Sequence, residues 1–289
     1  MRNVLVTGGN GQLASCIKDS ASLLKQYHFM YVDIDELDIT QSSAVTAFFD
    51  ANAIQFCVNC AAYTNVDQSE SESEIAEKVN VAGARNLAEA CKKFNAKLIQ
   101  ISTDFVFDGK SSLPYVETDT TKPISIYGLT KLKGELATAN TLREHFILRT
   151  SWLYSEHGNN FCKTMLRLAK EKKVLNIVSD QVGTPTYAVD LAAVILKIIK
   201  SDSSNYGVYH YSNEGVASWY DFAKAIFDLS GTNIELHPIR SVAYPTPAKR
   251  PAFSVMDKSK IKTALSITIP YWRDSLTVAL QKIERSKKS

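Results

Sequence analysis

The chain has 289 residues, of which 45% are hydrophobic and 22% are charged, values that fit a globular protein with a large core and exclude a mostly disordered chain. Its formal net charge of +3 is not gathered into one stripe, apart from the terminal stretch 282–289, so we expect no nucleic-acid surface. No apolar run approaches the ~18 residues needed to cross a bilayer and no signal-peptide pattern is present, so we expect a cytoplasmic protein without membrane contact.

The first half of the chain alternates short apolar runs with amphipathic stretches. This pattern predicts strands at 3–7, 29–33, 55–59, 97–102 and 145–149, and helices at 11–25, 42–51, 73–94 and about 126–141. Alternation of this kind implies right-handed crossovers and a parallel sheet covered on both faces. We therefore predict an α/β fold, a Rossmann-type doubly wound parallel sheet, with a dinucleotide-binding domain over 1–150.

The second half is less regular. Its pattern predicts helices at 161–172, 188–200, 218–229 and 272–285, a strand at 176–178, a tyrosine-rich segment at 206–211 and a proline-punctuated loop at 244–251. We predict that 151–289 form mainly a smaller C-terminal substrate-binding lobe, with segments from about 174–200 joining the first domain.

A glycine-rich turn follows the first predicted strand. Residues 7–14 read Thr-Gly-Gly-Asn-Gly-Gln-Leu-Ala and open the first predicted helix. Glycines allow the backbone to approach a pyrophosphate closely, and a helix N-terminus offers unpaired N–H groups. We therefore predict that Gly8, Gly11, Gln12 and Leu13 bind a dinucleotide; an ordinary tight strand–helix turn is the alternative.

Asp33 ends the second predicted strand, near the ~20-residue spacing expected for an acidic residue that binds the adenosine ribose. No arginine follows closely, and a carboxylate repels a 2′-phosphate. Asp35 and Glu36 add to that repulsion. The sequence therefore predicts NADH or NADPH as cofactor, with NADH slightly favoured.

Two further segments fall where predicted strands end, which is where such folds bind ligands. Asp38 and Ile39 are expected to meet the adenine, and the segment Ala61, Ala62 and Tyr63 has small residues along which a cofactor can lie. Plain loop packing is an equal alternative for both segments.

Tyr127 and Lys131 are four residues apart and share one face of a predicted helix. A neighbouring ammonium favours the phenolate, so we expect the pKa of Tyr127 to lie below ~10, which suits proton transfer near neutrality. Thr103, directly after a predicted strand, offers a hydroxyl for a reacting carbonyl. For the Tyr–Lys pair alone, a surface helix contact is the alternative.

These motifs together resemble an extended short-chain dehydrogenase/reductase and, more closely, the dTDP-4-dehydrorhamnose reductase family. The runs that carry the resemblance span nearly the whole chain in family order: 8–14, 37–40, 61–67, 102–109, 127–135, 149–152, 160–166, 180–186 and 250–251.

The resemblance implies a role for several site residues. Tyr127 would donate the proton, Lys131 would assist it and anchor the nicotinamide ribose, and Thr103 with Asp104 would touch the sugar. Trp152 would pack near the sugar, with a core aromatic as the alternative.

Arg250 lies in the proline-punctuated loop, and its planar fork suits the substrate diphosphate. An exposed loop arginine is the alternative. The related 4,6-dehydratases usually carry Asp-Glu after the threonine, whereas this chain carries Asp104 and Phe105. A phenylalanine cannot do acid–base work, so reduction fits better than elimination.

The resemblance thus implies NAD(P)H-dependent reduction of a dTDP-6-deoxy-4-ketohexose to dTDP-L-rhamnose, with a nucleotide sugar as substrate. Another nucleotide-sugar reductase, an epimerase and a non-catalytic regulatory subunit are alternatives. Some family members bind Mg²⁺ at a dimer contact through a carboxylate early in the first helix, but residues 12–17 hold no carboxylate. We predict no metal, and either a monomer or a homodimer.

The cysteines do not add a second chemistry. They number five, which does not indicate a disulfide framework. Cys57 and Cys60 form a C-x-x-C, but the run 54–62 reads as a buried strand, where residues three apart face opposite sides. A redox pair is expected at a helix N-terminus instead.

Overall fold

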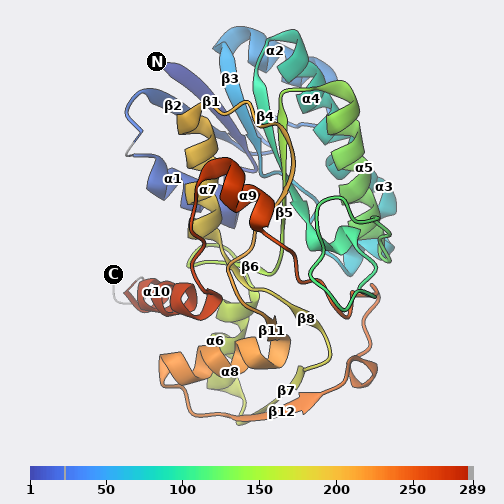
Figure 1. The fold of residues 1–289 in the computed structure, drawn as a ribbon, viewed down its shortest axis with the longest axis vertical. Coiled ribbons are helices and arrows are strands. Elements are labelled where there is room, and N and C mark those ends of the chain that lie inside the picture. Colours follow the sequence, from blue (N-terminus) through green and yellow to red (C-terminus); the bar gives the residue numbers. More distant parts are fainter. Residues whose placement is uncertain (23, 286–289) are drawn as a thin grey trace.

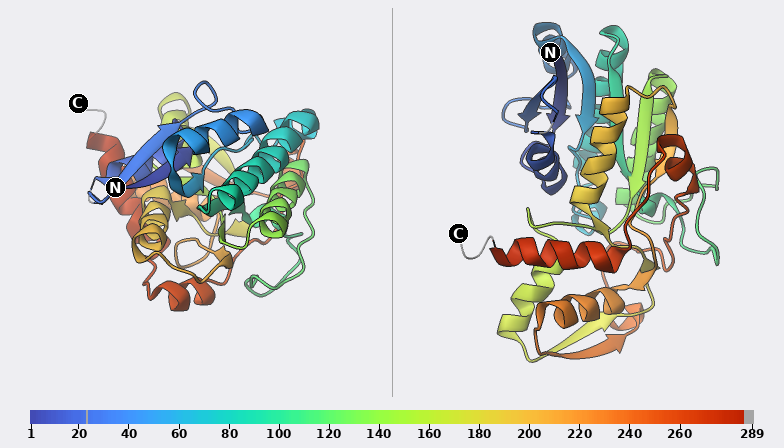
Figure 2. Two further views of the ribbon diagram at one scale, coloured as in Figure 1. Left: turned by 90° about the horizontal axis from the view of Figure 1, so that it is seen from above. Right: turned by 60° about the vertical axis from the view of Figure 1, so that its left-hand side comes forward.

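A computed structural model describes residues 1–22 and 24–285. Figure 1 shows a sheet with helices on both faces above a smaller part, and Figure 2 shows α10 running along the boundary between the two. The described residues form a six-stranded parallel sheet in the order β10-β5-β4-β3-β1-β2. The strands are β1 Arg2–Thr7, β2 Tyr27–Val32, β3 Ile54–Asn59, β4 Lys97–Thr103, β5 His145–Thr150 and β10 Gly207–His210. The predicted doubly wound α/β fold is confirmed.

The strand order reverses between β1 and β3, which lie side by side although β2 separates them in the chain. Open parallel sheets bind ligands at such a reversal, beyond the carboxyl ends of the strands. The last residues of these two strands, Thr7 and Asn59, are paired in register, and the Thr7 hydroxyl donates a hydrogen bond to Asn59 Oδ1 at 2.7 Å. This contact fixes the two strand ends that frame the reversal.

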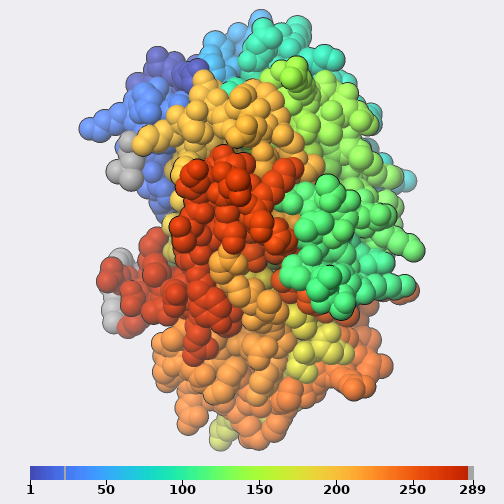
Figure 3. Space-filling view, viewed as in Figure 1, coloured from blue at the N-terminus to red at the C-terminus, as the bar shows by residue number. Residues whose placement is uncertain are grey.

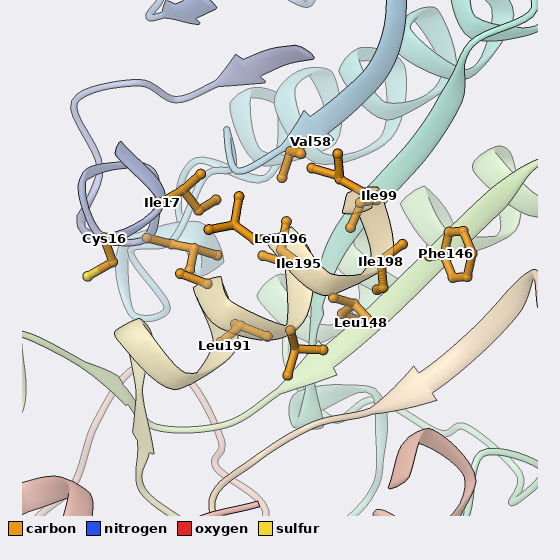
Figure 4. Close-up of a cluster of buried hydrophobic side chains, with 14 of the residues drawn as sticks. Cys16, Ile17, Val58, Ile99, Phe146, Leu148, Leu191, Ile195, Leu196 and Ile198 are labelled. Atoms are coloured by element: carbon orange, nitrogen blue, oxygen red, sulfur yellow. The ribbon is translucent and has the colours of Figure 1, made fainter. Parts of the chain in front are cut away.

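Two helices cover one face of the sheet. Helices α1 (Gln12–Ala21) and α7 (Ala188–Ser201) pack against each other and against β1, β3, β4 and β5 through buried aliphatic side chains, as Figure 4 shows. The opposite face is covered by α2 (Ser42–Asn52) and α4 (Ala84–Lys93). α5 (Ile126–Thr141) packs beside α4. Helix α1 ends four residues before its predicted end at residue 25.

The helix predicted over 73–94 is interrupted by a wider turn. It consists of α3 (Ser73–Glu77), a π-helical segment at Lys78–Gly83 and then α4. Buried Asn80 lies in the widened turn, and its side chain accepts a hydrogen bond from Tyr63 N at 2.9 Å and donates to Thr130 Oγ1 at 3.0 Å. π turns often occur at functional sites. Here the turn ties the loop after β3 to α5.

The smaller part has its own core of aromatic and aliphatic side chains. Its elements are α6 Phe161–Glu171, β7 Val174–Val178, α8 Trp219–Ser230, β12 Glu235–Ile239 and α10 Trp272–Arg285. Short strands connect this part to the sheet: β6 Leu153–Tyr154, β8 Val182–Gly183, β9 Thr186–Tyr187 and β11 Ala217–Ser218. The terminal stretch 282–289, in which the sequence gathers positive charge, falls partly on 286–289, outside the described residues.

Two segments from the second half of the chain return to the sheet. Helix α7 lies on α1, and β10 pairs with β5 as the edge strand. The tyrosine-rich segment 206–211, which we placed in the smaller lobe, therefore belongs to the sheet. Tyr209 points into the core there, whereas its sequence pattern alone did not show which part would bury it.

The segment after β12 runs back along the sheet domain. Met256 bridges to Tyr115, and α9 (Ser259–Leu265) follows. Figure 3 shows this C-terminal segment, in red, beside the green segment that follows β4. All five cysteines, which lie within the described residues, are free thiols. None of the described helices is both long enough and apolar enough to cross a membrane.

Candidate active site

A cavity of about 920 Å³ lies at the carboxyl end of the sheet, between the sheet and the smaller part. Every site residue predicted from the sequence lines it. These residues are Gly8, Gly11, Gln12, Leu13, Asp33, Asp38, Ile39, Ala61, Ala62, Tyr63, Thr103, Asp104, Tyr127, Lys131, Trp152 and Arg250. The fold thus brings the glycine turn, the Tyr–Lys pair and the predicted sugar contacts into one space.

The glycine turn forms one end of the cavity. Gly8 has a φ of +64°, and a methyl group there would lie 2.8 Å from the backbone nitrogen of Ala61. Only glycine fits this position without strain. Gly11, which has no side chain to cap the helix, precedes the first residue of α1. The N–H groups of the first helical turn therefore face the cavity, which suits a phosphate.

Asp33 follows β2 and closes the turn from the other side. Its carboxylate accepts hydrogen bonds from Asn10 N at 2.9 Å and from Ile34 N at 2.8 Å. The side chain is thus fixed at the cavity wall beside the glycines, and its contact with a ribose stays a prediction. Asp38 and Ile39 line the same wall.

Tyr127 and Lys131 lie on the first two turns of α5. The helix begins after Ser125, whose hydroxyl accepts a hydrogen bond from Gly128 N at 3.2 Å. Gly128 packs directly on the carbonyl of Phe105, so a side chain at that position would push α5 away from the residues after β4. This close approach brings Tyr127 to Thr103.

Thr103 ends β4, and its hydroxyl donates to Asp104 Oδ1 at 3.1 Å and accepts from Phe105 N at 3.2 Å. The ring of Phe105 packs edge-on against Tyr127, with centroids 5.6 Å apart. Phe105 therefore forms part of the apolar surround of the phenol, and contributes no acid.

The predicted lowering of the Tyr127 pKa is wrong in direction. Burial removes water from the phenol and raises its pKa to about 12, against the smaller opposing effect of a hydrogen bond with Thr103. The Lys131 ammonium donates instead to the carbonyl of Ile101 at 2.7 Å. Burial also lowers the pKa of Lys131 to about 8, although the charge of Glu135 opposes this.

A buried ion pair lies behind this group. Glu135, one turn after Lys131 on α5, accepts hydrogen bonds from Ser102 Oγ at 2.5 Å and from Arg149 at 2.7 to 3.2 Å. The contacts join α5, which carries Tyr127, to β4, which carries Thr103, and to β5. Sequence analysis gave Glu135 no role, although the i, i+4 spacing from Lys131 was a usable signal.

Asp104 is buried beside Thr103, and its Oδ2 has no hydrogen-bond partner among the described residues. Burial raises its pKa to about 6, despite hydrogen bonds that stabilise the carboxylate. An unpaired buried oxygen at a cavity wall is available to a polar ligand. The contact of Asp104 with a sugar stays a prediction.

Trp152 adopts a left-handed backbone conformation, with a φ of +47°. Such a conformation costs a bulky residue about 1–3 kcal/mol and needs support from its surroundings. Its indole stacks on Trp219, with ring centroids 3.6 Å apart and planes within 6°. Trp219 and Phe161 also line the cavity. Sequence analysis missed both, because aromatic residues at helix starts carry no specific signal.

Arg250 lines the cavity, and its guanidinium group is already hydrogen-bonded to other residues. It donates to the two carboxylate oxygens of Asp67 at 3.0 and 2.9 Å, and also to Thr246 Oγ1 at 2.6 Å. This pairing lowers the pKa of Asp67. It links the loop after β3 to the proline-punctuated loop after β12.

One group of potential metal ligands occurs among residues 1–22 and 24–285, formed by Asp19, Glu156 and His157. His157 Nε2 lies 2.7 Å from Asp19, while Glu156 lies 3.1 Å from Lys282 and accepts a hydrogen bond from Tyr187. Each of the three groups thus already has a partner among the described residues. The absence of a metal stays a prediction.

A doubly wound sheet with a glycine-rich first turn, and a Tyr–Lys pair with a threonine in the same cavity, define an NAD(P)-dependent oxidoreductase of the extended short-chain dehydrogenase type. Residues 1–285 match the model of a family described as the RmlD substrate binding domain. The chain therefore belongs to the dTDP-4-dehydrorhamnose reductase family.

Individual relatives agree over nearly full length. The dTDP-4-dehydrorhamnose reductase of Aggregatibacter actinomycetemcomitans is 42% identical over 286 residues, which cover 96% of this chain and 97% of that protein. A solved dTDP-4-dehydrorhamnose reductase from Clostridium acetobutylicum is 41% identical with a TM-score of 0.93, covering 98% of this chain and 99% of its own. The enzyme of that name from Bacillus anthracis, solved in complex with NADP, is 38% identical with a TM-score of 0.94, covering 98% and 100%.

Proposed function

We propose that this enzyme reduces the C4 ketone of dTDP-4-dehydro-6-deoxy-L-mannose and forms dTDP-L-rhamnose. The observation that carries the proposal is the meeting of Tyr127, Lys131 and Thr103 in the cavity that the glycine turn opens. The names of the relatives supply the sugar nucleotide.

When bound, a reduced nicotinamide would supply the hydride for C4. Tyr127 then gives its phenolic proton to the oxygen at C4 as negative charge develops there. The raised pKa keeps this phenol protonated at neutral pH, so it acts as a proton donor without prior activation. Thr103 orients the same oxygen by a hydrogen bond, for which its hydroxyl turns its one proton away from Asp104 Oδ1.

Lys131 would hold the nicotinamide ribose, because it lines the cavity together with the glycine turn and Tyr127. The carbonyl of Ile101 uses one of its three N–H donors and leaves the others for ribose hydroxyls. The ammonium also compensates the charge left on Tyr127 after proton transfer. These steps take the proton from a side chain and require no metal.

Either reduced cofactor is accepted under this proposal, with NADH slightly favoured. The Asp33 carboxylate lies at the wall where the adenosine ribose is expected, and a 2′-phosphate there would meet like charge. The relative from Bacillus anthracis binds NADP, which supports use of the phosphorylated cofactor too. The ratio of kcat/KM for the two cofactors measures this preference.

Residues beyond 150 bind mainly the nucleotide sugar under this proposal. Trp152, Phe161, Trp219 and Arg250 all come from this part of the chain and line the cavity. Size-exclusion chromatography with light scattering decides between the proposed monomer and homodimer.

Coupled turnover tests the function. Enzymatically made dTDP-4-dehydro-6-deoxy-L-mannose is supplied with NADH or NADPH, cofactor oxidation is followed by absorbance, and the product is identified. Stoichiometric oxidation with formation of dTDP-L-rhamnose is the expected result. Conversion without net cofactor oxidation would indicate an epimerase and refute the proposal.

A further inference from the structure

The stacked pair Trp152 and Trp219 joins the two parts of the molecule at the cavity. Trp152 follows β5, whereas Trp219 is the first residue of α8 in the smaller part. Offset or tilted geometries are usual for aromatic pairs, but these indoles lie within 6° of parallel at 3.6 Å. The pair is therefore a close, fixed contact.

The Trp152 indole is also held in place by close packing against Gly183. A methyl group on Gly183 would lie 2.8 Å from Cε2 and 2.9 Å from Cζ2 of the Trp152 indole. The backbone is fixed as well, because Thr186 N donates to Trp152 O at 3.2 Å and Ser151 Oγ donates to Thr184 O at 2.7 Å. These contacts leave the indole little freedom.

Trp219 is anchored in turn by the core of the smaller part. Its ring lies 4.7 Å from Phe161 and 6.5 Å from Phe222, which is fully buried. The helix start is fixed by reciprocal hydrogen bonds between Ser218 and Asp221. A continuous set of aromatic contacts therefore runs from the lobe core to Trp152.

The position of Trp152 indicates which part of the ligand it meets. In the sheet register, Thr150 pairs with the catalytic Thr103, and Trp152 comes two residues later. Next in the chain, Leu153 accepts a hydrogen bond from Gln12 of the glycine turn at 3.2 Å. Trp152 thus lies where the proton-donor group and the cofactor turn come together, which is where the reacting sugar ring must lie.

We propose that Trp219 is a positioning residue that fixes the Trp152 indole against the sugar ring of the substrate and leaves the nucleotide to other contacts. This inference rests on the proposed function. It assigns to Trp219, in the smaller part, a share in aligning the C4 ketone with Tyr127 and Thr103.

The test compares Trp219→Leu, which removes the stack, with Trp219→Phe, which keeps an aromatic face, and with Gly183→Ala, which displaces the indole from the other contact. Trp219→Leu and Gly183→Ala should both lower kcat/KM for the keto sugar nucleotide about 10- to 100-fold, because small misplacements near a reacting centre are costly. Trp219→Phe should recover most of the activity. Inhibition by dTDP, which lacks the sugar, should change less than about twofold in all three.

Circular dichroism supplies a second readout. Two of the three tryptophans form the stacked pair, so we expect their excitonic coupling to give a couplet in the spectrum. It should disappear in Trp219→Leu and weaken in Gly183→Ala, and it should persist in Trp272→Phe, which leaves the pair intact. Trp272→Phe should also keep kcat/KM for the keto sugar nucleotide.

Three outcomes overturn the inference: unchanged kcat/KM after loss of the couplet, a rise in the dTDP inhibition constant parallel to the loss of activity, and failure of Trp219→Phe to recover activity while folded. If Trp219→Leu does not fold, Gly183→Ala and Trp219→Phe carry the same comparison. Absence of turnover by the wild-type enzyme would instead refute the proposed function.

Discussion

Glu135 and Arg149 form a bidentate ion pair, and their side chains are only 4% and 5% exposed. Glu135 lies one turn after Lys131 on α5. Removing one partner leaves the other as an uncompensated buried charge. Glu135→Ala should therefore lower the free energy of unfolding by about 3–5 kcal/mol. Urea denaturation measures the change.

The matched control for that variant is Glu171→Ala. Glu171 pairs with Arg167 on the surface of α6, where both side chains are more than half exposed. Exposed pairs contribute less than about 1 kcal/mol. Equal effects of the two substitutions would show that the buried pair has no special structural role.

Tyr127→Phe should lower kcat by about 10²- to 10⁴-fold, the usual contribution of a positioned proton donor. The ring and its contact with Phe105 remain, so the cofactor Kd should change little. Steady-state kinetics and cofactor fluorescence titration provide the two numbers. Tyr271→Phe removes a phenol outside the cavity and should be neutral; wild-type turnover in Tyr127→Phe would reject the proton-donor role.

Lys131 should give the enzyme an alkaline limit. Its pKa falls from 10.5 to about 8 on folding, so the ammonium that holds the ribose is lost as pH rises through about 8. kcat/KM should decline above that pH, since this parameter reports the free enzyme. Lys131→Arg, which cannot lose its charge in this range, should be slower, but its kcat/KM should not decline above pH 8.

The same residue has the opposite effect on stability. Between pH 8 and 10.5 the unfolded chain binds more protons at Lys131 than the folded chain does, so its contribution to stability rises with pH. Wild type should gain stability relative to Lys131→Met across this window. A wild-type free energy of unfolding that stays level or falls relative to that of Lys131→Met as pH rises would contradict the lowered pKa.

Asp104→Asn should stabilise the protein at neutral pH while weakening substrate binding. The pKa of Asp104 rises from 3.8 to about 6 on folding, so the folded state loses stability as pH rises through this range. A shift of this size corresponds to about 2–3 kcal/mol. The stability gain should grow from pH 4 to pH 6 and then level off.

Exposed Asp50 on α2 provides the control for Asp104. Asp50→Asn should change the free energy of unfolding by less than about 0.5 kcal/mol. A destabilised Asp104→Asn variant at pH 7 would show that the carboxylate, despite its unpaired oxygen, is well compensated.

Arg250→Ala should raise KM for the sugar nucleotide about tenfold if its fork exchanges Asp67 for the substrate diphosphate. Asp67→Asn removes the competing charge and should leave KM unchanged or lower. Steady-state kinetics of both variants and of the double variant separates the two roles. Equal increases in KM for both single variants would show that the pair only holds its two loops together.

Short sequence patterns predicted much of the site. The turn from Gly8 to Leu13 and the Tyr127–Lys131 pair are recognisable because each is a short segment whose spacing sets its geometry. The sheet then aligned their strands and helix starts at one edge, so that the residues line a single cavity. Alternating apolar and amphipathic runs were enough to predict that arrangement.

Other features depend on contacts between distant segments. The pairs Glu135–Arg149 and Asp67–Arg250 and the stack of Trp152 on Trp219 each join residues whose proximity exists only in the folded chain. The direction of the Tyr127 pKa failed for the same reason, because spacing reveals a neighbouring lysine but does not reveal burial.

The return of β10 to the edge of the sheet has a consequence for dissecting this enzyme. Cleavage after residue 150 would separate β5 from β10, the edge strand that pairs with it. It would also separate α1 from α7, the helix that packs on it. The first fragment would lose the α7 side of its core, and the second would keep the core of the smaller part but expose the apolar faces of α7 and β10. We therefore expect separately produced halves to aggregate alone and to regain solubility only when produced together.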